Sequence, residues 1–141
     1  MTPRSLTHST TIHVRFSECD PLKIVWHGNY VKYFEDGRED FGKHHDFSYL
    51  EIYSKNGLSV PLVHLEMDYK RTASFGETLR VETKLIDDPA AKIVFEYKIF
   101  NSANQIICTG KTVQAFVHLE KHELQITMPP FFEEWKNKHL R

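Results

Sequence analysis

Cysteine, excess charge of either sign and long apolar runs are all scarce in this sequence of 141 residues. Two cysteines, Cys19 and Cys108, are too few for a disulfide framework, so a reducing cytoplasm is the expected location. The formal net charge of −1 lacks the basic excess with which proteins follow nucleic-acid phosphates, and no nucleic-acid partner is expected. No apolar run approaches the roughly 20 residues that a membrane span needs, and the start, MTPRSLTHST, lacks the apolar segment of a secretory signal.

The first half of the chain predicts one strand and two helices. Apolar and polar residues alternate over residues 11–16, which indicates a half-buried strand that Asp20-Pro21 would end. A helix should follow, capped by Asn29 or a residue just before it, and Gly37 within it indicates close packing. Its expected apolar stripe consists of Tyr30, Val31, Phe34 and Phe41. A capping box at Ser48–Glu51 predicts a short second helix that stops at Asn56-Gly57.

The second half of the chain reads as strands followed by a short helix. Tight turns should join the strands into an antiparallel sheet, which residues 63–69, 79–85, 93–99 and 105–119 would form, with a bulge at Gly110. Pro129-Pro130 introduces the last helix, which carries Phe131, Phe132 and Trp135. No repeat or linker interrupts the chain, so residues 1–141 should form one domain. The expected class is α+β, an antiparallel sheet wrapped around one long helix.

The segment between Phe16 and Phe41 places a carboxylate, an aromatic residue and a histidine at the start of the long helix. The first N–H groups of a helix lack partners within it and lie at its positive end, so they can stabilise an oxyanion. Asp20 would approach the same point as a nucleophile or as a base for water. Spacing alone leaves a second interpretation open, in which Asp20 is a solvated or capping residue.

Residues 20–30, DPLKIVWHGNY, followed by Phe34-Glu35 and Arg38, resemble the signature of hotdog-fold acyl-CoA thioesterases. These enzymes are related to hydroxybenzoyl-CoA thioesterase and to the thioesterase associated with the Tol–Pal cluster. Residues 61–63 and 68–77 resemble the family's second strand and the turn after it. The resemblance implies a hotdog fold, in which the sheet encloses the long helix.

The same resemblance assigns roles to individual residues. It implies that Asp20 is the catalytic carboxylate, as nucleophile or general base, and that the backbone N–H of His27 belongs to the oxyanion hole. Trp26 and Gly28, in the same motif, are expected to contact the substrate. The sequence departs from the family at Leu22-Lys23, where a small residue and glycine are more common. A lysine there would alter access or charge near the thioester.

Other residues compete for chemical roles. Cys19 could act as a nucleophile, but the neighbouring Asp20 should raise the pKa of its thiol and disfavour the thiolate. The residues His64, Glu66 and Asp68 alternate on one strand face, where they could hold an ion, face solvent or form a dimer contact. No zinc-type motif or dinucleotide-binding glycine motif occurs, so neither a metal nor another cofactor is expected.

The expected partners are an acyl-CoA substrate and further copies of the same chain. Arg71 is the preferred residue for the coenzyme A phosphates, with Lys70 and Arg80 as further candidates. The resemblance implies a homodimer or homotetramer in which two sheets join edge to edge, so that His64 would enter the partner's site.

The predicted activity is hydrolysis of an acyl-CoA to a free acid and coenzyme A. Three alternatives remain open: a thioesterase acting on acyl groups carried by acyl carrier protein, a non-catalytic acyl-CoA-binding module, and a dehydratase that would use His44 or His45.

Overall fold

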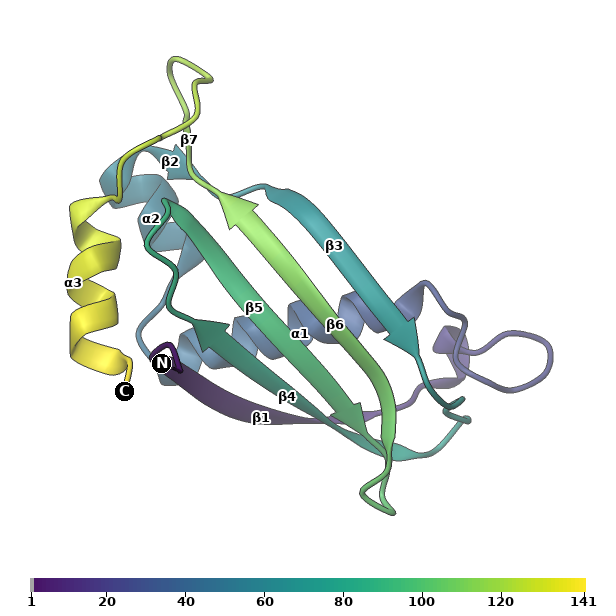
Figure 1. Cartoon of the computed structure of the whole chain (residues 1–141). Helices are drawn as coiled ribbons and strands as arrows, with labels where there is room; N and C mark the ends of the chain where they lie inside the picture. The colour runs from purple at the N-terminus through teal and green to yellow at the C-terminus, as the bar shows by residue number, and fades with distance from the viewer. Residues whose placement is uncertain (1) are drawn as a thin grey trace.

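The computed structural model describes residues 2–141 and contains a five-stranded antiparallel sheet with a long helix, α1, across one face (Figure 1). The strand order is β1-β4-β5-β6-β3, which leaves β1 and β3 at the two edges. The strands are β1 (Ser5–His13), β3 (Leu62–Tyr69), β4 (Thr78–Ile86), β5 (Lys92–Phe100) and β6 (Ile106–Ala115). The helices are α1 (Asn29–His44), α2 (Tyr49–Asn56), α3 (Pro130–His139) and the short 3₁₀ helix η1 (Phe16–Glu18). The expected α+β architecture is confirmed.

The first strand differs from the sequence prediction. It spans Ser5–His13 rather than residues 11–16, and Phe16 begins η1 instead of continuing a strand. The side chains of β1 that point toward α1 include His8 and Thr10, both of which bond to Asp40 of α1. Leu6 and Ile12 share this inward face and pack against the core, but the two positions between them are polar, so the apolar alternation is interrupted.

The buried stripe of α1 contains Tyr33 in place of Val31. Tyr33 is fully buried and its hydroxyl donates to Glu18 Oε1 at 3.0 Å, whereas Val31 is only half-buried. The N-cap is Gly28, and the side chain of Asn29 donates instead to the backbone carbonyl of Glu18 at 2.7 Å. The prediction of close packing at Gly37 is confirmed, because a Cβ there would collide with Thr83 on the inner face of β4.

Gly110 is not a bulge. The β3–β6 and β5–β6 registers both run regularly through it, opposite Met67 and Tyr97. Its missing side chain makes room for the ring of Phe34, which a Cβ at this position would strike. Phe34 in turn stacks on Tyr97, with ring centroids 4.1 Å apart. Helix and sheet therefore pack closely at Gly37 of α1 and at Gly110 of β6.

The face of the sheet turned away from α1 is charged. Cross-strand neighbours alternate in sign along Lys84, Glu96, Lys111 and Glu66, in strands β4, β5, β6 and β3. Opposite charges directly across a ladder stabilise the pairing modestly and keep the face in water. The apolar core consequently lies between α1 and the inner face of the sheet.

Two shorter helices close one end of the core. Ser48 caps α2 by accepting the N–H of Glu51 at 3.2 Å, and Gly57 ends that helix at φ 63°, as the sequence predicts. The expected fourth strand of the second half divides at Phe116 into β6 and a short strand β7 (Val117–His118), which pairs with β2 (Leu58–Ser59). Phe132 of α3 is buried in the core. Among the described residues, none of the helices has the length and apolar character to span a bilayer.

Candidate active site

The loop of residues 19–28 joins η1 to α1 and extends beyond the end of the sheet (Figure 1). Hydrogen bonds to the segment after β3 hold this loop in place. Val25 N donates to Ala73 O at 2.8 Å, and Phe75 N donates to Lys23 O at 3.1 Å. Lys23 has φ 67°, in the left-handed region that favours glycine. The departure from the family pattern at Lys23 thus falls where the backbone itself prefers glycine.

Asp20 occupies the turn within this loop and is half-buried. Its backbone N–H donates to Ile24 O at 2.8 Å, and its Oδ1 accepts the N–H of Leu22 at 2.8 Å. No hydrogen bond within residues 2–141 involves its Oδ2. One carboxylate oxygen is therefore anchored, while the other is free to meet a substrate or a water.

His27 and Gly28 lie at the start of α1. Their backbone N–H groups donate to no acceptor in the described part of the chain, whereas Asn29 N donates to Trp26 O at 2.9 Å. The helix dipole adds positive potential at this end of α1. The ring of Trp26 folds back over Gly28, where a Cβ would collide with it, and stacks obliquely on His27 at 4.9 Å. The Asp20 loop therefore leads into a helix start at which two backbone N–H groups have no acceptor among the described residues.

Tyr69 is a site residue that the sequence analysis missed. It ends β3 on the inner face of the sheet, and its hydroxyl donates to His27 O at 3.0 Å. Its ring also meets that of Tyr30 edge-on at 5.6 Å. Partial burial and the nearby Cys108 raise the pKa of Tyr69, so the phenol stays protonated and donates. The resembling segment 68–77 contained this residue, but nothing in the motif singled it out.

The other candidate residues lie apart from Asp20. His64 pairs with Val113 and lies on the outer face of the sheet, where its Nε2 is 3.6 Å from Glu66 Oε2. Tyr69 and Met67 point to the opposite face. Arg71 is exposed in the segment after β3, with its backbone N–H bonded to Ile107 O. It stands two residues before Ala73, which holds the Asp20 loop, whereas Arg80 lies over the ring of Phe100.

Neither thiol is activated. Partial burial, together with the carboxylates of Glu18 and Asp20, raises the pKa of Cys19, in the direction that the sequence predicts. Burial and Asp68 raise the pKa of Cys108 to about 12. A thiolate is the nucleophilic form of cysteine, so Asp20 is the better candidate for the reacting group.

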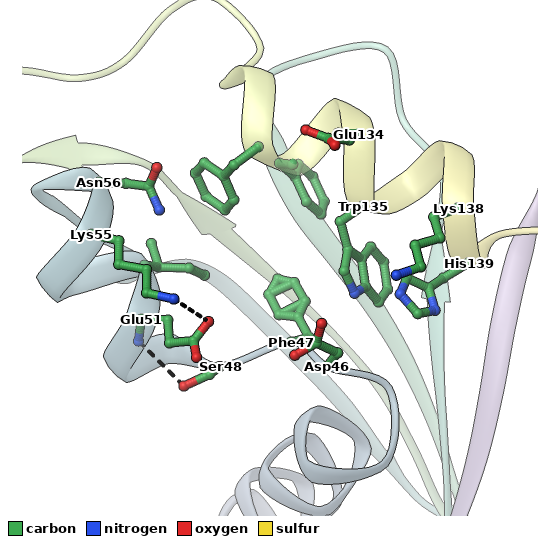
Figure 2. A pocket seen from close by; sticks show the side chains of 13 residues that line it. Asp46, Phe47, Ser48, Glu51, Lys55, Asn56, Glu134, Trp135, Lys138 and His139 are labelled. Carbon is green, nitrogen blue, oxygen red and sulfur yellow. Dashed lines mark hydrogen bonds and ion pairs between the residues drawn. The ribbon is translucent and has the colours of Figure 1, made fainter.

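The hollows described in the chain lie away from Asp20. One of about 280 Å³ separates α2 from α3, with Phe47 and Trp135 among its lining residues and Lys55 and Lys138 at its rim (Figure 2). Another, of about 340 Å³, lies on the charged outer face of the sheet. Asp20 and His27 line neither of them. The candidate site lies at the start of α1, outside both hollows.

A sheet wrapped around a single helix, with a carboxylate loop at the start of that helix, defines a protein of the hotdog type. Residues 14–136 match the family model of the thioesterase-like superfamily, and the chain belongs to this family. The family and the class of enzyme expected from the sequence, a thioesterase of the hotdog fold, are confirmed.

Individual relatives agree with this assignment. The chain is 32% identical to the putative acyl-CoA thioesterase YneP of Bacillus subtilis over 88% of each sequence. A DHNA-CoA thioesterase structure from Staphylococcus aureus superposes with a TM-score of 0.83 at 27% identity, covering 94% of this chain and 89% of that one. The 4-hydroxybenzoyl CoA thioesterase of Pseudomonas sp. strain CBS-3 shares the fold, with a TM-score of 0.79 at 20% identity over 94% and 99% of the two chains.

Proposed function

We propose that this protein hydrolyses acyl-CoA thioesters to a free acid and coenzyme A, with Asp20 supplying or activating the oxygen nucleophile. The observation that carries the proposal is the half-anchored carboxylate of Asp20 in the loop before α1, where two backbone N–H groups lack partners. The names of the Bacillus subtilis and Staphylococcus aureus relatives support coenzyme A as the carrier.

Two routes are compatible with this geometry. In the first, Asp20 Oδ2 attacks the thioester carbonyl, coenzyme A leaves as the thiol, and water hydrolyses the resulting anhydride. In the second, Asp20 removes a proton from the attacking water. Both routes develop negative charge on the carbonyl oxygen, which the N–H groups of His27 and Gly28 would stabilise together with the helix dipole.

The binding surface is proposed to continue from the loop along the end of β3. Tyr69 and Trp26 are half-exposed and flank His27 and Gly28, so they would contact the acyl group or the thioester. Arg71 stands at the rim of this surface and would bind a phosphate of coenzyme A, because a guanidinium can donate two hydrogen bonds to one phosphate. Lys23 would add positive charge beside the same entrance.

A homodimer through β3 would complete the site. The outer edge of β3 has no strand beside it among residues 2–141, and Val63, Leu65 and Tyr69 are 61%, 41% and 51% exposed. Unpaired edges with apolar side chains favour association. Two copies paired there would place Tyr69 and the Asp20 loop beside the partner's sheet, with His64 at the contact. Val63→Glu should give monomers in sedimentation experiments, and a stable dimer of this variant would contradict the proposed contact.

Asp20→Asn tests the chemical step. The amide oxygen can still accept the Leu22 N–H, so the melting temperature should stay close to that of the wild type. Release of free thiol from acyl-CoA should fall about 10²- to 10⁴-fold, the usual contribution of a positioned base. Cys19→Ala is the matched control, because it alters the adjacent residue and should keep most of the activity. Near wild-type turnover in Asp20→Asn would refute the assignment, and an inactive but folded Cys19→Ala would transfer the role to the thiol.

A further inference from the structure

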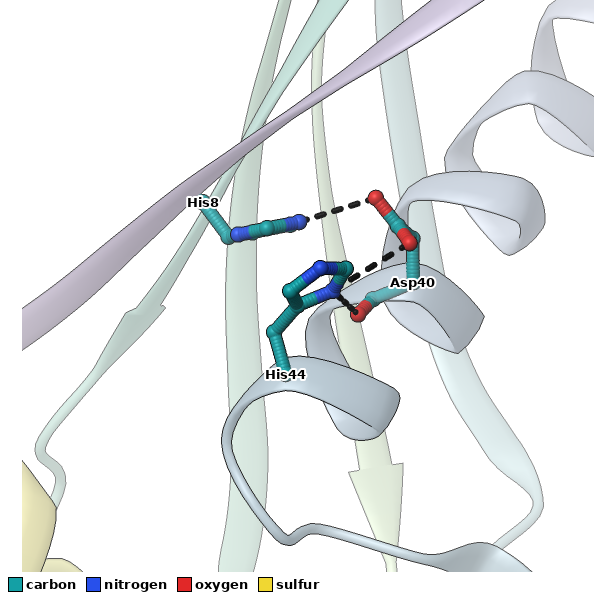
Figure 3. A group of neighbouring side chains, drawn as sticks. All are labelled: His8, Asp40 and His44. Carbon is teal, nitrogen blue, oxygen red and sulfur yellow. Dashed lines mark hydrogen bonds and ion pairs between the residues drawn. The ribbon is translucent and has the colours of Figure 1, made fainter.

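A cluster of two histidines and an aspartate joins β1 to the end of α1, far from the Asp20 loop (Figure 3). Its members are His8, Asp40 and His44. Asp40 lies eleven residues after the start of α1, which corresponds to about 16 Å along the helix axis. The cluster is therefore separate from the candidate active site.

The contacts within the cluster are short. His8 Nε2 lies 2.8 Å from Asp40 Oδ2, and His44 Nδ1 lies 3.3 Å from Asp40 Oδ1. The three ligand atoms all fall within 4.8 Å of one another. In a tetrahedral zinc site with bonds of about 2.0–2.1 Å, neighbouring ligand atoms are about 3.3 Å apart. The two histidines approach different oxygens of Asp40, at 2.8 and 3.3 Å, so only a small movement of the side chains would bring three ligand atoms to this spacing.

The local structure explains how these side chains meet. Asp40 and His44 are four residues apart on α1, a spacing that places both on one face of a helix. His8 reaches the same point from an inward position of β1, and its ring stacks on that of His44 at 4.4 Å. Thr10 Oγ1 donates to Asp40 Oδ2 at 2.8 Å and so orients the carboxylate, as outer partners of metal ligands commonly do.

Accessibility and charge also suit a cation. The side chains of His8, Asp40 and His44 are 17%, 31% and 57% exposed, so an ion can enter from solvent. A shallow hollow beside the cluster is lined by the carboxylates of Asp36, Glu39 and Asp40, against the single ammonium of Lys43. This excess of negative charge would attract a divalent ion.

We propose that His8, Asp40 and His44 form a binding site for a divalent transition-metal ion such as Zn²⁺. Two imidazole nitrogens and one carboxylate are ligands that zinc accepts, and water would complete a tetrahedral arrangement. His44 Nδ1 now donates to the Asp40 carbonyl at 2.9 Å, and His8 Nε2 is hydrogen-bonded to Asp40 Oδ2 at 2.8 Å. The ion would replace both hydrogen bonds, with the proton of each ring on the other nitrogen. The ion would fasten the edge strand β1 to the last turns of α1 and would act on stability rather than on the thioester.

The test is calorimetric titration of ZnCl₂ into chelator-treated, desalted protein, with a parallel Co²⁺ titration followed by visible absorption. The wild type should bind one equivalent. His8→Gln, Asp40→Asn and His44→Gln should each weaken binding by at least about 10-fold, since even outer-shell changes cost about 10- to 100-fold. His13→Gln is the matched control on the same strand, because His13 is exposed and its ring bonds to Thr78 rather than to the cluster, and it should bind as the wild type does.

Zinc should also raise the melting temperature of the wild type and of His13→Gln, but not that of the three cluster variants. Should Asp40→Asn fail to fold, His44→Gln decides the matter, because this side chain is more than half exposed on the helix surface. Absence of zinc binding by the wild type at micromolar concentrations would overturn the proposal. Unchanged binding in His8→Gln and His44→Gln would overturn it as well, by assigning the zinc to other histidines.

Discussion

A buried ion pair between α3 and the turn after β4 predicts an unequal response to the loss of its two members. The side chain of Lys136 is only 3% exposed, and its Nζ donates to Asp87 Oδ1 at 2.8 Å and to Asp88 O at 3.2 Å. Asp87 is 23% exposed, and its Oδ2 also accepts two hydrogen bonds from Arg4, at 3.0 and 3.1 Å. Lys136 thus depends on Asp87 far more than Asp87 depends on Lys136.

The two single variants should differ in unfolding free energy. Asp87→Asn removes the carboxylate nearest to the buried Lys136 ammonium and leaves the half-exposed Glu133 at 3.8 Å. Breaking a buried pair typically costs about 3–5 kcal/mol, and Glu133 places the expected loss at the lower end of that range. Lys136→Met should cost about 1–2 kcal/mol, because it loses hydrogen bonds to a charged group but refills the buried space, while Arg4 still neutralises Asp87. In the double variant the buried charge is gone, so its cost should fall short of the sum of the singles by about 1 kcal/mol or more.

Urea denaturation at pH 7 of the wild type, both single variants and the double variant measures these differences. A domain of this kind has about 5–15 kcal/mol of stability in total, so each loss is large enough to resolve. An additive double variant, or a Lys136→Met that costs more than Asp87→Asn, would contradict the reasoning. Either result would mean that the Lys136 ammonium gains little from Asp87.

Three further predictions concern stability. Burial acts to raise the pKa of Asp87, but hydrogen bonds from Lys136 and Arg4 outweigh it and lower the pKa below its ordinary value. The stability that this carboxylate contributes is therefore complete above the ordinary carboxyl pKa of about 4 and is lost as the pH falls through the lowered pKa. Urea midpoints at pH 7 and pH 3 should consequently differ less in Asp87→Asn than in the wild type. Gly110→Ala should destabilise by about 1–3 kcal/mol through overpacking against Phe34, and a melting temperature at or above that of the wild type would contradict this packing. Lys23→Gly should be more stable than Lys23→Ala by about 1 kcal/mol, because only glycine adopts φ 67° without strain; equal unfolding free energies would disprove the strain.

The elements with local periodicity could be predicted from the sequence. The four strands of the second half, the long helix and the capped start of α2 all occur where the patterns indicate. The cap of α1 is also confirmed, since Gly28 is the residue just before Asn29. The error within α1 is Tyr33, which is buried with its hydroxyl bonded to Glu18, a partner outside the helix.

The start of the first strand could not be found from its sequence for a similar reason. Between its inward apolar residues Leu6 and Ile12 stand the polar His8 and Thr10, whose partner is Asp40, about 30 positions away. A hydrophobic pattern indicates burial in an apolar core, and it does not detect a strand whose inner face meets a carboxylate. For the same reason the cluster of His8, Asp40 and His44 could not be predicted, because its members share no short motif.

Tyr69 shows why the site was only partly predictable. The motif of residues 20–30 identifies the loop and the start of α1, because the chemistry there depends on residues close in sequence. Tyr69 joins them only because β3 ends beside His27, 42 positions earlier in the chain. The alternation of β3 correctly separates Leu65, Met67 and Tyr69 from His64, Glu66 and Asp68, yet it does not say which set faces α1. Val63 falls at an irregularity in the pairing with β6, which the alternation does not show. The structure decides it, because Met67 packs against the core and the hydroxyl of Tyr69, on the same face, reaches the start of α1.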